Sequence, residues 1–329
     1  MKLITEVPLP KDIPEISYGS SLMFIGSCFA SNVGEKFSAA KFDVSVNPFG
    51  VLFNPFSVLD SMDRIVERRY FSESDFFRAE DGSYLSLSLH GDFRFATASE
   101  GAAAVNALID TLYERLSGLT HVFYTFGTSQ VFRYRPTGEI CANCHKIPQK
   151  EFSKESMTAG QITNLALSVG ESLRSINPDV NIVYTVSPVR YLNEGPLGAN
   201  AGKGRLFCAI EDILERSGAG NYYFPAYEIV MDELRDYRYF AGDMVHPNSL
   251  AVDYIWEKIC SCMFGGGTLS VLGEVERIER DCSHRPFNPS GTAYRDFCRA
   301  ALERIASLEE RFPRMDFGPE KNVLRTWAP

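Results

Sequence analysis

The sequence predicts an α/β protein in which helices cover both faces of a parallel sheet. Three short apolar runs, rich in β-branched and aromatic residues, are each followed by Gly, Ser or Pro; they lie at residues 22–25, 121–126 and 181–186. Amphipathic stretches separate them, and strands that alternate with helices form parallel sheets. The 329 residues suffice for one large domain of this class or for two small ones.

Each element is expected from its own pattern. The strands are expected at residues 22–25, 42–46, 121–126, 181–186 and 222–224, the second and the last with weaker patterns. The helices are expected at residues 31–40, 55–67, 102–117, 158–176, 202–216 and 249–263. Within 102–117, for example, Val105, Ile109 and Leu112 fall on one helical face, as in a helix that packs on a sheet.

Two regions depart from this alternation. Asp81-Gly82 lies between Phe76-Phe77 and an alternating run that begins at Tyr84, which predicts an inserted β-hairpin around residues 70–98. After Gly265-Gly266-Gly267 the pattern becomes helical, with helices expected at residues 269–282 and 290–311. We therefore expect an α/β domain over residues 1–264, with the insertion, and a C-terminal helical hairpin over 265–329 that packs on it.

Composition excludes some classes of partner. The formal net charge is −9 and no segment gathers Lys and Arg into a stripe, which argues against a nucleic-acid partner. No apolar stretch reaches the roughly 18–20 residues that span a bilayer. The first residues carry Glu6 and prolines where a signal peptide has an apolar core, and the eight cysteines are scattered in apolar contexts. A cytoplasmic protein with free thiols is expected.

Polar residues follow three of the predicted strands. Ser27, Gly127-Thr128-Ser129 and Ser187-Pro188-Val189-Arg190 all come directly after a strand. In a parallel sheet these positions share one edge, where such folds bind ligands. Ser27 also precedes a helical pattern, so it is close to the positive end of the helix dipole. The alternative is that Ser27 only caps the helix.

A histidine that could activate this serine lies far downstream. Asp243 precedes His246 by three residues, so a single turn can present both side chains to one point. Asn248-Ser249 is typical of a helix N-terminus, which leaves His246 on the loop before it. We expect Ser27 to act as nucleophile, His246 as its base and Asp243 as the group that orients the imidazole. The competing interpretation is a helix cap and a solvated histidine.

The literal string Gly26-Ser27-Cys28-Phe29-Ala30, together with the downstream Asp243 and His246, resembles the GSCFA family of the SGNH (GDSL-like) hydrolase superfamily. The resemblance implies a flavodoxin-like, three-layer α/β/α fold and ester hydrolysis without a cofactor or a metal. Further segments match the family's pattern: Asn47-Pro48-Phe49-Gly50, Gly127-Thr128-Ser129, Ala142-Asn143-Cys144-His145-Lys146, Ser187-Pro188-Val189-Arg190 and His284-Arg285-Pro286-Phe287.

The resemblance also implies an oxyanion hole. Its donors would be the backbone N–H groups of Ser27 and Gly50, since glycine allows close approach of a substrate. The third donor in the superfamily is an asparagine side chain in a Gly-x-Asn motif. This chain has Gly127-Thr128-Ser129-Gln130 there, so Thr128, Ser129 or Gln130 must replace it.

Other polar residues have two interpretations each. The resemblance implies that Asn143 and His145 lie near the pocket, where His145 binds substrate or is a structural histidine. Arg190 can hold an anionic substrate group or form an internal salt bridge. Cys141-x-x-Cys144-His145 matches a haem-attachment signature, but that attachment occurs outside the cytoplasm. Cys28 is expected to point away from Ser27.

The expected activity is cleavage of a small acyl ester, such as an acetyl group on a sugar or on an envelope-related metabolite. The expected partner is therefore a small-molecule or glycan ester. Two alternatives stay open. One is a carbohydrate-binding or other ligand-binding module that keeps the fold without efficient chemistry, favoured by the missing asparagine. The other is an acyltransferase that passes the acyl group to another hydroxyl.

Overall fold

The computed structural model describes residues 4–287 and 291–326. Within them a parallel sheet has the strand order β10-β9-β5-β1-β2. Numbered along the chain, its strands run 2-1-3-4-5 from one edge, the flavodoxin-like order. The bounds are β1 Ser21–Gly26, β2 Asp43–Val46, β5 His121–Phe126, β9 Asn181–Val186 and β10 Asn221–Tyr223.

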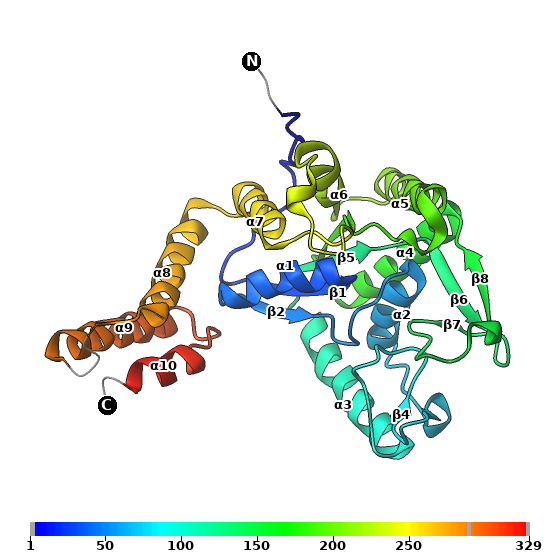
Figure 1. The fold of residues 1–329 in the computed structure, drawn as a ribbon, viewed down its shortest axis with the longest axis horizontal. Helices are drawn as coiled ribbons and strands as arrows, with labels where there is room; N and C mark the ends of the chain where they lie inside the picture. Colours follow the sequence, from blue (N-terminus) through cyan, green and yellow to red (C-terminus); the bar gives the residue numbers. More distant parts are fainter. Residues whose placement is uncertain (1–3, 288–290, 327–329) are drawn as a thin grey trace.

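Alternate residues of the strands face two separate cores. In β1, Met23 and Ile25 belong to the core shared with helices α2, α3, α4 and α5, whereas Leu22 and Phe24 belong to the core shared with α1 and α7. The sheet thus lies between two layers of helices (Figure 1). The helix bounds are α1 Cys28–Ala39, α2 Pro55–Val66, α3 Ala98–Leu116, α4 Ala159–Ile176, α5 Gly195–Arg216, α6 Ala226–Glu228 and α7 Ser249–Met263.

The predicted fold class is confirmed, and the five expected strands agree with the structure to within one residue at each end. Some helices begin earlier than the sequence suggests. α1 begins at Cys28 rather than at residue 31, because Ser27 caps it, and α5 begins at Gly195 rather than at 202. Glycines at the start of α5 have low helix propensity, so packing on the sheet decides its first turns.

The expected insertion contains a hairpin, but a short one. β3 (Phe77–Arg78) pairs antiparallel with β4 (Tyr84–Leu85), and the strand ends at Leu85 although the alternating pattern continues to Leu89. The chain instead turns, with Leu89 N–H donating to Ser86 O at 3.1 Å.

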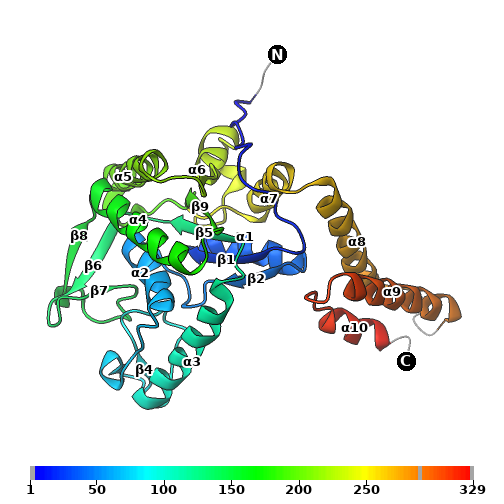
Figure 2. The ribbon, with the colours of Figure 1, turned by 180° about the vertical axis from the view of Figure 1, so that it is seen from behind.

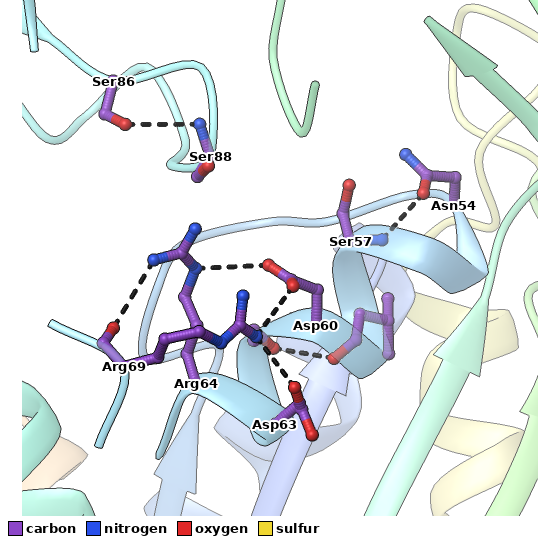
Figure 3. A network of polar contacts seen from close by, with 10 residues as sticks. Asn54, Ser57, Asp60, Asp63, Arg64, Arg69, Ser86 and Ser88 are labelled. Carbon is purple, nitrogen blue, oxygen red and sulfur yellow. Dashed lines mark hydrogen bonds and ion pairs between the residues drawn. The ribbon is translucent and has the colours of Figure 1, made fainter. Parts of the chain in front are cut away.

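A polar network at the end of α2 anchors the segment that leads into the insertion (Figure 3). Asp60 accepts from Arg64 Nε at 3.2 Å and from an Arg69 nitrogen at 2.9 Å, and Asp63 accepts from Arg69 at 2.8 Å. The Arg64 guanidinium also lies 4.4 Å from the ring centre of Phe71. These contacts fix the direction in which the chain leaves α2.

A second small sheet was not expected from the sequence. β6 (Gln130–Tyr134) pairs antiparallel with β7 (Ile140–Cys141) and with β8 (Phe152–Ser156). Its strands are short and mostly half-buried, so they lack a continuous apolar run.

The C-terminal region forms three helices, α8 (Gly266–Ser283), α9 (Thr292–Arg311) and α10 (Gly318–Arg325), of which α10 was not expected. The predicted start of α9 at residue 290 lies outside the described residues. Figures 1 and 2 show these helices beside β2, extending away from the sheet. Lys41 pairs with Glu320 and Asp43 with Arg314, so contact is made at the amino end of the sheet.

In the part of the chain that is described, no helix is long and apolar enough to cross a membrane.

Candidate active site

A cavity of about 370 Å³ lies at the carboxyl end of the sheet, where β1, β5 and β9 end. The loop that carries His246 forms its other wall. Its lining residues are Ser27, Cys28, Phe53, Gly127, Ser187, Val189, Arg190, Tyr191, Leu192, Asn193, Val245 and His246. Segments that are distant in sequence therefore meet at the edge where ligands bind in parallel sheets.

Ser27 sits at the junction between β1 and α1. Its backbone is extended, and its Oγ accepts the Phe29 N–H at 3.3 Å, so it caps α1. Gly26 before it has φ of 156° and lies so close to β5 that an added Cβ would be 2.3 Å from Thr125 O. Only glycine fits there, and this close approach fixes where the serine leaves the sheet.

Asn47 ties the serine turn to the next strand. Its side-chain oxygen accepts the Gly26 N–H at 2.8 Å, and its side-chain nitrogen donates to Ser31 Oγ at 2.8 Å. Asn47 itself has φ of 42°, a left-handed conformation that asparagine tolerates better than most residues. Sequence reasoning placed Asn47 only in a family segment and missed this positioning role.

Asp243 and His246 form a hydrogen-bonded pair. Asp243 Oδ2 lies 2.6 Å from His246 Nδ1, and Oδ1 accepts the backbone N–H groups of Val245 at 2.9 Å and of His246 at 3.0 Å. These hydrogen bonds lower the pKa of Asp243 to about 2, so the carboxylate is ionised and can only accept. The imidazole proton must then lie on Nδ1, which leaves Nε2 of the neutral ring free to accept a proton.

The loop around this pair is closed by its own backbone. Phe240 and Pro247 form an antiparallel bridge, and Ala241 N–H donates to His246 O at 2.7 Å. Asn248 caps α7 by accepting the Ala251 N–H, while its amide group donates to Arg238 O and Phe240 O. The loop geometry is therefore set before any ligand binds.

Ser27 and His246 both line this cavity. In the described residues no hydrogen bond joins the serine hydroxyl to the imidazole, and Ser27 Oγ is instead bonded to Phe29 N–H. Ser27 is only 2% exposed, whereas the His246 side chain is 46% exposed. Hydrogen bonds between catalytic groups are often absent in sites without bound substrate and form only in the complex.

The backbone donors expected for an oxyanion hole are engaged elsewhere. Ser27 N–H donates to Thr125 O at 3.3 Å, Gly50 N–H donates to Asn47 O at 2.7 Å, and Gly127 N–H donates to Phe53 O at 2.8 Å. Gly50 has φ of 80°, and an added Cβ would be 2.1 Å from His90 Cβ. The requirement for glycine at this position thus has a packing explanation.

The expected substitutes for the missing asparagine, Thr128, Ser129 and Gln130, are not among the residues that line the cavity, although the preceding Gly127 is. Thr128 and Ser129 are buried and face α5, where an added Cβ on Gly202 would be 3.7 Å from Thr128 Oγ1 and 3.6 Å from Ser129 Oγ. Thr128 Oγ1 accepts the Gln130 N–H at 3.2 Å. These side chains support the strand end from behind.

Asn143 and His145 lie away from this cavity and against the insertion. His145 Nε2 is 2.7 Å from Ser86 O, and His145 N–H donates to Asn143 Oδ1 at 2.8 Å. Burial lowers the pKa of His145, which favours its neutral form. The structure thus gives both residues hydrogen bonds that join the β7 loop to residues 86–91.

Arg190 lines the cavity beside Ser27 and also a second cavity of about 350 Å³. One of its terminal nitrogens donates to Asn200 Oδ1 at 2.9 Å. Leu192 is likewise shared, so the two cavities adjoin along these side chains. The second cavity is lined mainly by apolar and aromatic side chains, among them Val230, Phe240 and Tyr237.

Cys28 was expected to point away from Ser27, yet it lines the same cavity. Burial raises the pKa of its thiol, which disfavours the reactive thiolate. The eight cysteines, all within the described residues, are free. In that part of the chain no group of three His, Cys, Asp or Glu side chains is placed to hold a metal ion.

One polar residue at the site was not predicted from the sequence. Lys203 of α5 is 3% exposed and donates to the carbonyls of Gly127 and Ser187, which both line the cavity. A signal was present, because Lys203 shares a helical face with Leu206, Ile210 and Ile213. A lysine on an apolar face is unusual and needs a specific reason.

Comparison with known proteins gives two family matches. The model described as the GSCFA family matches residues 21–259, and the model described as the GSCFA domain protein, C-terminal domain, matches residues 275–326. No curated protein matches. Among solved structures, the chain is similar to an acetyl xylan esterase, Est2A, from the rumen bacterium Butyrivibrio proteoclasticus, with 11% identity and a TM-score of 0.38. The alignment covers 75% of this chain and 64% of that esterase, less than two thirds of its length.

Proposed function

Because this chain belongs to the GSCFA family over residues 21–259, we propose that it is a serine hydrolase of the SGNH type that cleaves an acyl ester. The observation that carries the proposal is the cavity that Ser27 shares with His246, whose Nδ1 is held by the ionised Asp243. A buried serine at a strand-to-helix turn, together with a histidine held in one tautomer, is the arrangement that nucleophilic catalysis requires.

In the proposed reaction, Ser27 Oγ attacks the ester carbonyl carbon while His246 Nε2 takes the hydroxyl proton. The tetrahedral intermediate collapses with cleavage of the C–O bond, and His246 returns the proton to the leaving alcohol. Water, deprotonated by the same imidazole, then attacks the acyl-serine; the bond between the acyl carbon and Ser27 Oγ breaks, His246 returns the proton to Ser27 Oγ, and the acid is released. This sequence needs neither a metal nor a cofactor.

We assign the oxyanion donor to the first turn of α1. Phe29 N–H donates to Ser27 Oγ and Ala30 N–H donates to Ser27 O, but within the described residues the N–H of Cys28, the first residue of α1, has no acceptor, and Cys28 lines the cavity. The positive end of the α1 dipole lies at the same point. This assignment replaces the expected Gly50 N–H, which is bonded to Asn47 O.

The two adjoining cavities would bind different parts of the substrate. Apolar side chains such as Phe53, Val189 and Val245 surround Ser27, and this space suits a small acyl group. The neighbouring cavity would take the alcohol part, with Arg190 between the two and with Tyr237, which is 75% exposed, available to stack on a sugar ring. The free cysteines fit a reducing compartment, and we place the activity in the cytoplasm.

The test is labelling with a serine-directed fluorophosphonate, together with turnover of p-nitrophenyl acetate. We expect both labelling and turnover in the wild-type protein and neither in Ser27→Ala. In His246→Ala we expect the rates of both to fall tenfold or more. Ser38→Ala, which changes an exposed serine near the end of α1, is the matched control and should label like the wild type. Labelling that survives in Ser27→Ala would refute the proposed nucleophile.

A second candidate is a ligand-binding module of the same fold. The engaged N–H groups of Ser27, Gly50 and Gly127 favour it, because they leave few donors for an oxyanion. Binding of an acylated sugar without labelling or turnover would support this alternative. Acyl transfer is distinguished by product analysis with added alcohols, since a transferase forms a new ester and a hydrolase forms the free acid.

A further inference from the structure

Lys203 occupies an unusual position behind the cavity. Its Nζ donates to Gly127 O at 2.7 Å, at the end of β5, and to Ser187 O at 2.5 Å, at the end of β9. These strands are neighbours in the sheet, and each of the two residues lines the cavity that contains Ser27. The ammonium therefore bridges two strand ends at the edge where the proposed chemistry occurs.

Within the described residues the charge of Lys203 is not neutralised by a carboxylate. The four half-buried lysines there each form an ion pair with an acidic side chain, but no ion pair includes Lys203; the four are Lys36, Lys41, Lys258 and Lys321. The charges of Arg190 and Cys28 influence its pKa, and the centre of the Tyr227 ring lies 5.6 Å from Nζ. A buried cation without a counter-ion is costly, so its presence calls for a function.

We propose that Lys203 is a positioning residue of this site, which holds the carbonyls of Gly127 and Ser187 together and places an unpaired positive charge behind the cavity, where it favours negative charge on the substrate at Ser27. This inference rests on the proposed function. It supplies part of the electrostatic stabilisation that the missing asparagine would otherwise provide. A fixed charge in a water-poor environment acts more strongly than the same charge in water.

The charge on Lys203 can be switched by pH. Burial, and then the neighbouring Arg190, lower the pKa of Lys203 to about 7, while Cys28 acts in the opposite direction. Below this pH the ammonium carries its charge, and above it the amine is neutral. Negative charge on a reacted Ser27 would raise the pKa of Lys203, because an opposite charge favours the ionised form.

The experiment compares second-order rates of fluorophosphonate labelling of Ser27 from pH 6 to pH 9. Lys203→Met removes the charge and keeps an unbranched side chain, and Lys150→Met, at a side chain that is 81% exposed, is the control. We expect Lys203→Met to label at least tenfold more slowly than the wild type at pH 6 and this ratio to fall severalfold by pH 9, where only the hydrogen bonds of the neutral amine still separate the two proteins. A purely structural role would give a ratio that does not change with pH, and this result would overturn the inference.

Failure of the proposed function is recognised separately. If the wild-type protein is not labelled at Ser27, the proposed function fails and the inference falls with it. If the wild type is labelled and Lys203→Met labels at the same rate throughout, only the inference fails.

A second measurement covers the case in which Lys203→Met does not fold, as judged by circular dichroism. The side-chain 15Nζ resonance of Lys203 is titrated in the wild-type protein before and after a boronic acid forms a tetrahedral, negatively charged boronate on Ser27 Oγ. We expect the midpoint to move upward by about one pH unit or more. An unchanged midpoint would mean that Lys203 does not sense charge at Ser27 and would overturn the inference.

Discussion

Asp243 accepts hydrogen bonds from three N–H groups within one turn of backbone, and this concentration of donors explains its low pKa of about 2. Met244, between the aspartate and Val245, has φ of 58°, which allows the chain to fold back on the carboxylate. The Asp-x-x-His spacing is thus a compact device that sets a tautomer.

We expect Asp243→Asn to reduce labelling of Ser27 by a factor on the order of 10³ or more, since an amide can donate to Nδ1 and stabilise the opposite tautomer. The measurement is the fluorophosphonate labelling rate at pH 7.5. Asp296→Asn, at an exposed position on α9, should behave as the wild type. Equal rates in Asp243→Asn and the wild type would exclude a role for this carboxylate in orienting His246.

Lys203 also predicts a pH dependence of stability. Its pKa is about 7 in the folded protein and about 10.4 in an unfolded chain. Between these values the unfolded state binds the proton and the folded state does not, so the free energy of unfolding rises with pH by roughly 1.4 kcal/mol per unit. Below pH 7 both states are protonated and this contribution is constant. Urea denaturation at pH 7, 8 and 9 measures the free energy of unfolding of the wild type and of Lys203→Met. The value for the wild type should rise with pH relative to that for the variant. A difference that does not change with pH would contradict the burial of this amine.

At the scale of elements, the site depends on how strand ends are joined. The end of β1 is bonded to β5 through Ser27 N–H and to the residue after β2 through Asn47, while Lys203 of α5 joins β5 to β9. The loop before α7 completes the wall through Arg190 N–H, which donates to Val245 O at 3.4 Å. Each contact joins segments that are distant in sequence, so no local sequence pattern predicts it.

Asn47 allows a test at this scale. Asn47→Ala removes the hydrogen bonds to Gly26 and Ser31 and places alanine in a left-handed conformation, so we expect a loss of roughly 2–4 kcal/mol in the free energy of unfolding. Asn47→Gly removes the same bonds without the conformational cost and should be about 1 kcal/mol less destabilising. Denaturation in urea measures both, and slower labelling of Ser27 in each variant would link the turn to the site. Wild-type stability in Asn47→Ala would contradict this account.

At the scale of the whole molecule, the C-terminal helices and the site lie at opposite ends of the sheet. Phe312 contacts Tyr18 at 5.5 Å between ring centres, and Arg314 pairs with Asp43 at the start of β2. The cavity lies at the other end, where the strands finish. These helices are therefore not placed to cover the cavity.

We expect Phe317→Ala to destabilise the molecule by roughly 3–5 kcal/mol, because this ring is fully buried in a core that also contains residues of α1 and β1. If α8–α10 and the α/β domain unfold together, the far-UV circular dichroism and the fluorescence of Trp256, measured in a Trp327→Phe background, should report one shared and lowered transition. A fluorescence transition that stays at the wild-type midpoint would show that the C-terminal helices unfold independently.

The fold class, the five core strands and the place of Ser27 at a strand-to-helix turn can all be predicted from the amino-acid sequence. These features follow from local patterns that extend over a few residues: the alternation of apolar and polar residues, helix caps, and the Gly, Ser and Pro residues that follow the strands. Other features are visible only in the folded molecule. They are the backbone N–H groups that are already hydrogen-bonded, the position of Asn143 and His145 against the insertion, the position of Cys28 in the cavity wall, and the position of Lys203 behind the cavity. These outcomes depend on contacts between distant segments, and the free energy of such contacts is set by packing and by burial of charge, neither of which has a local signature.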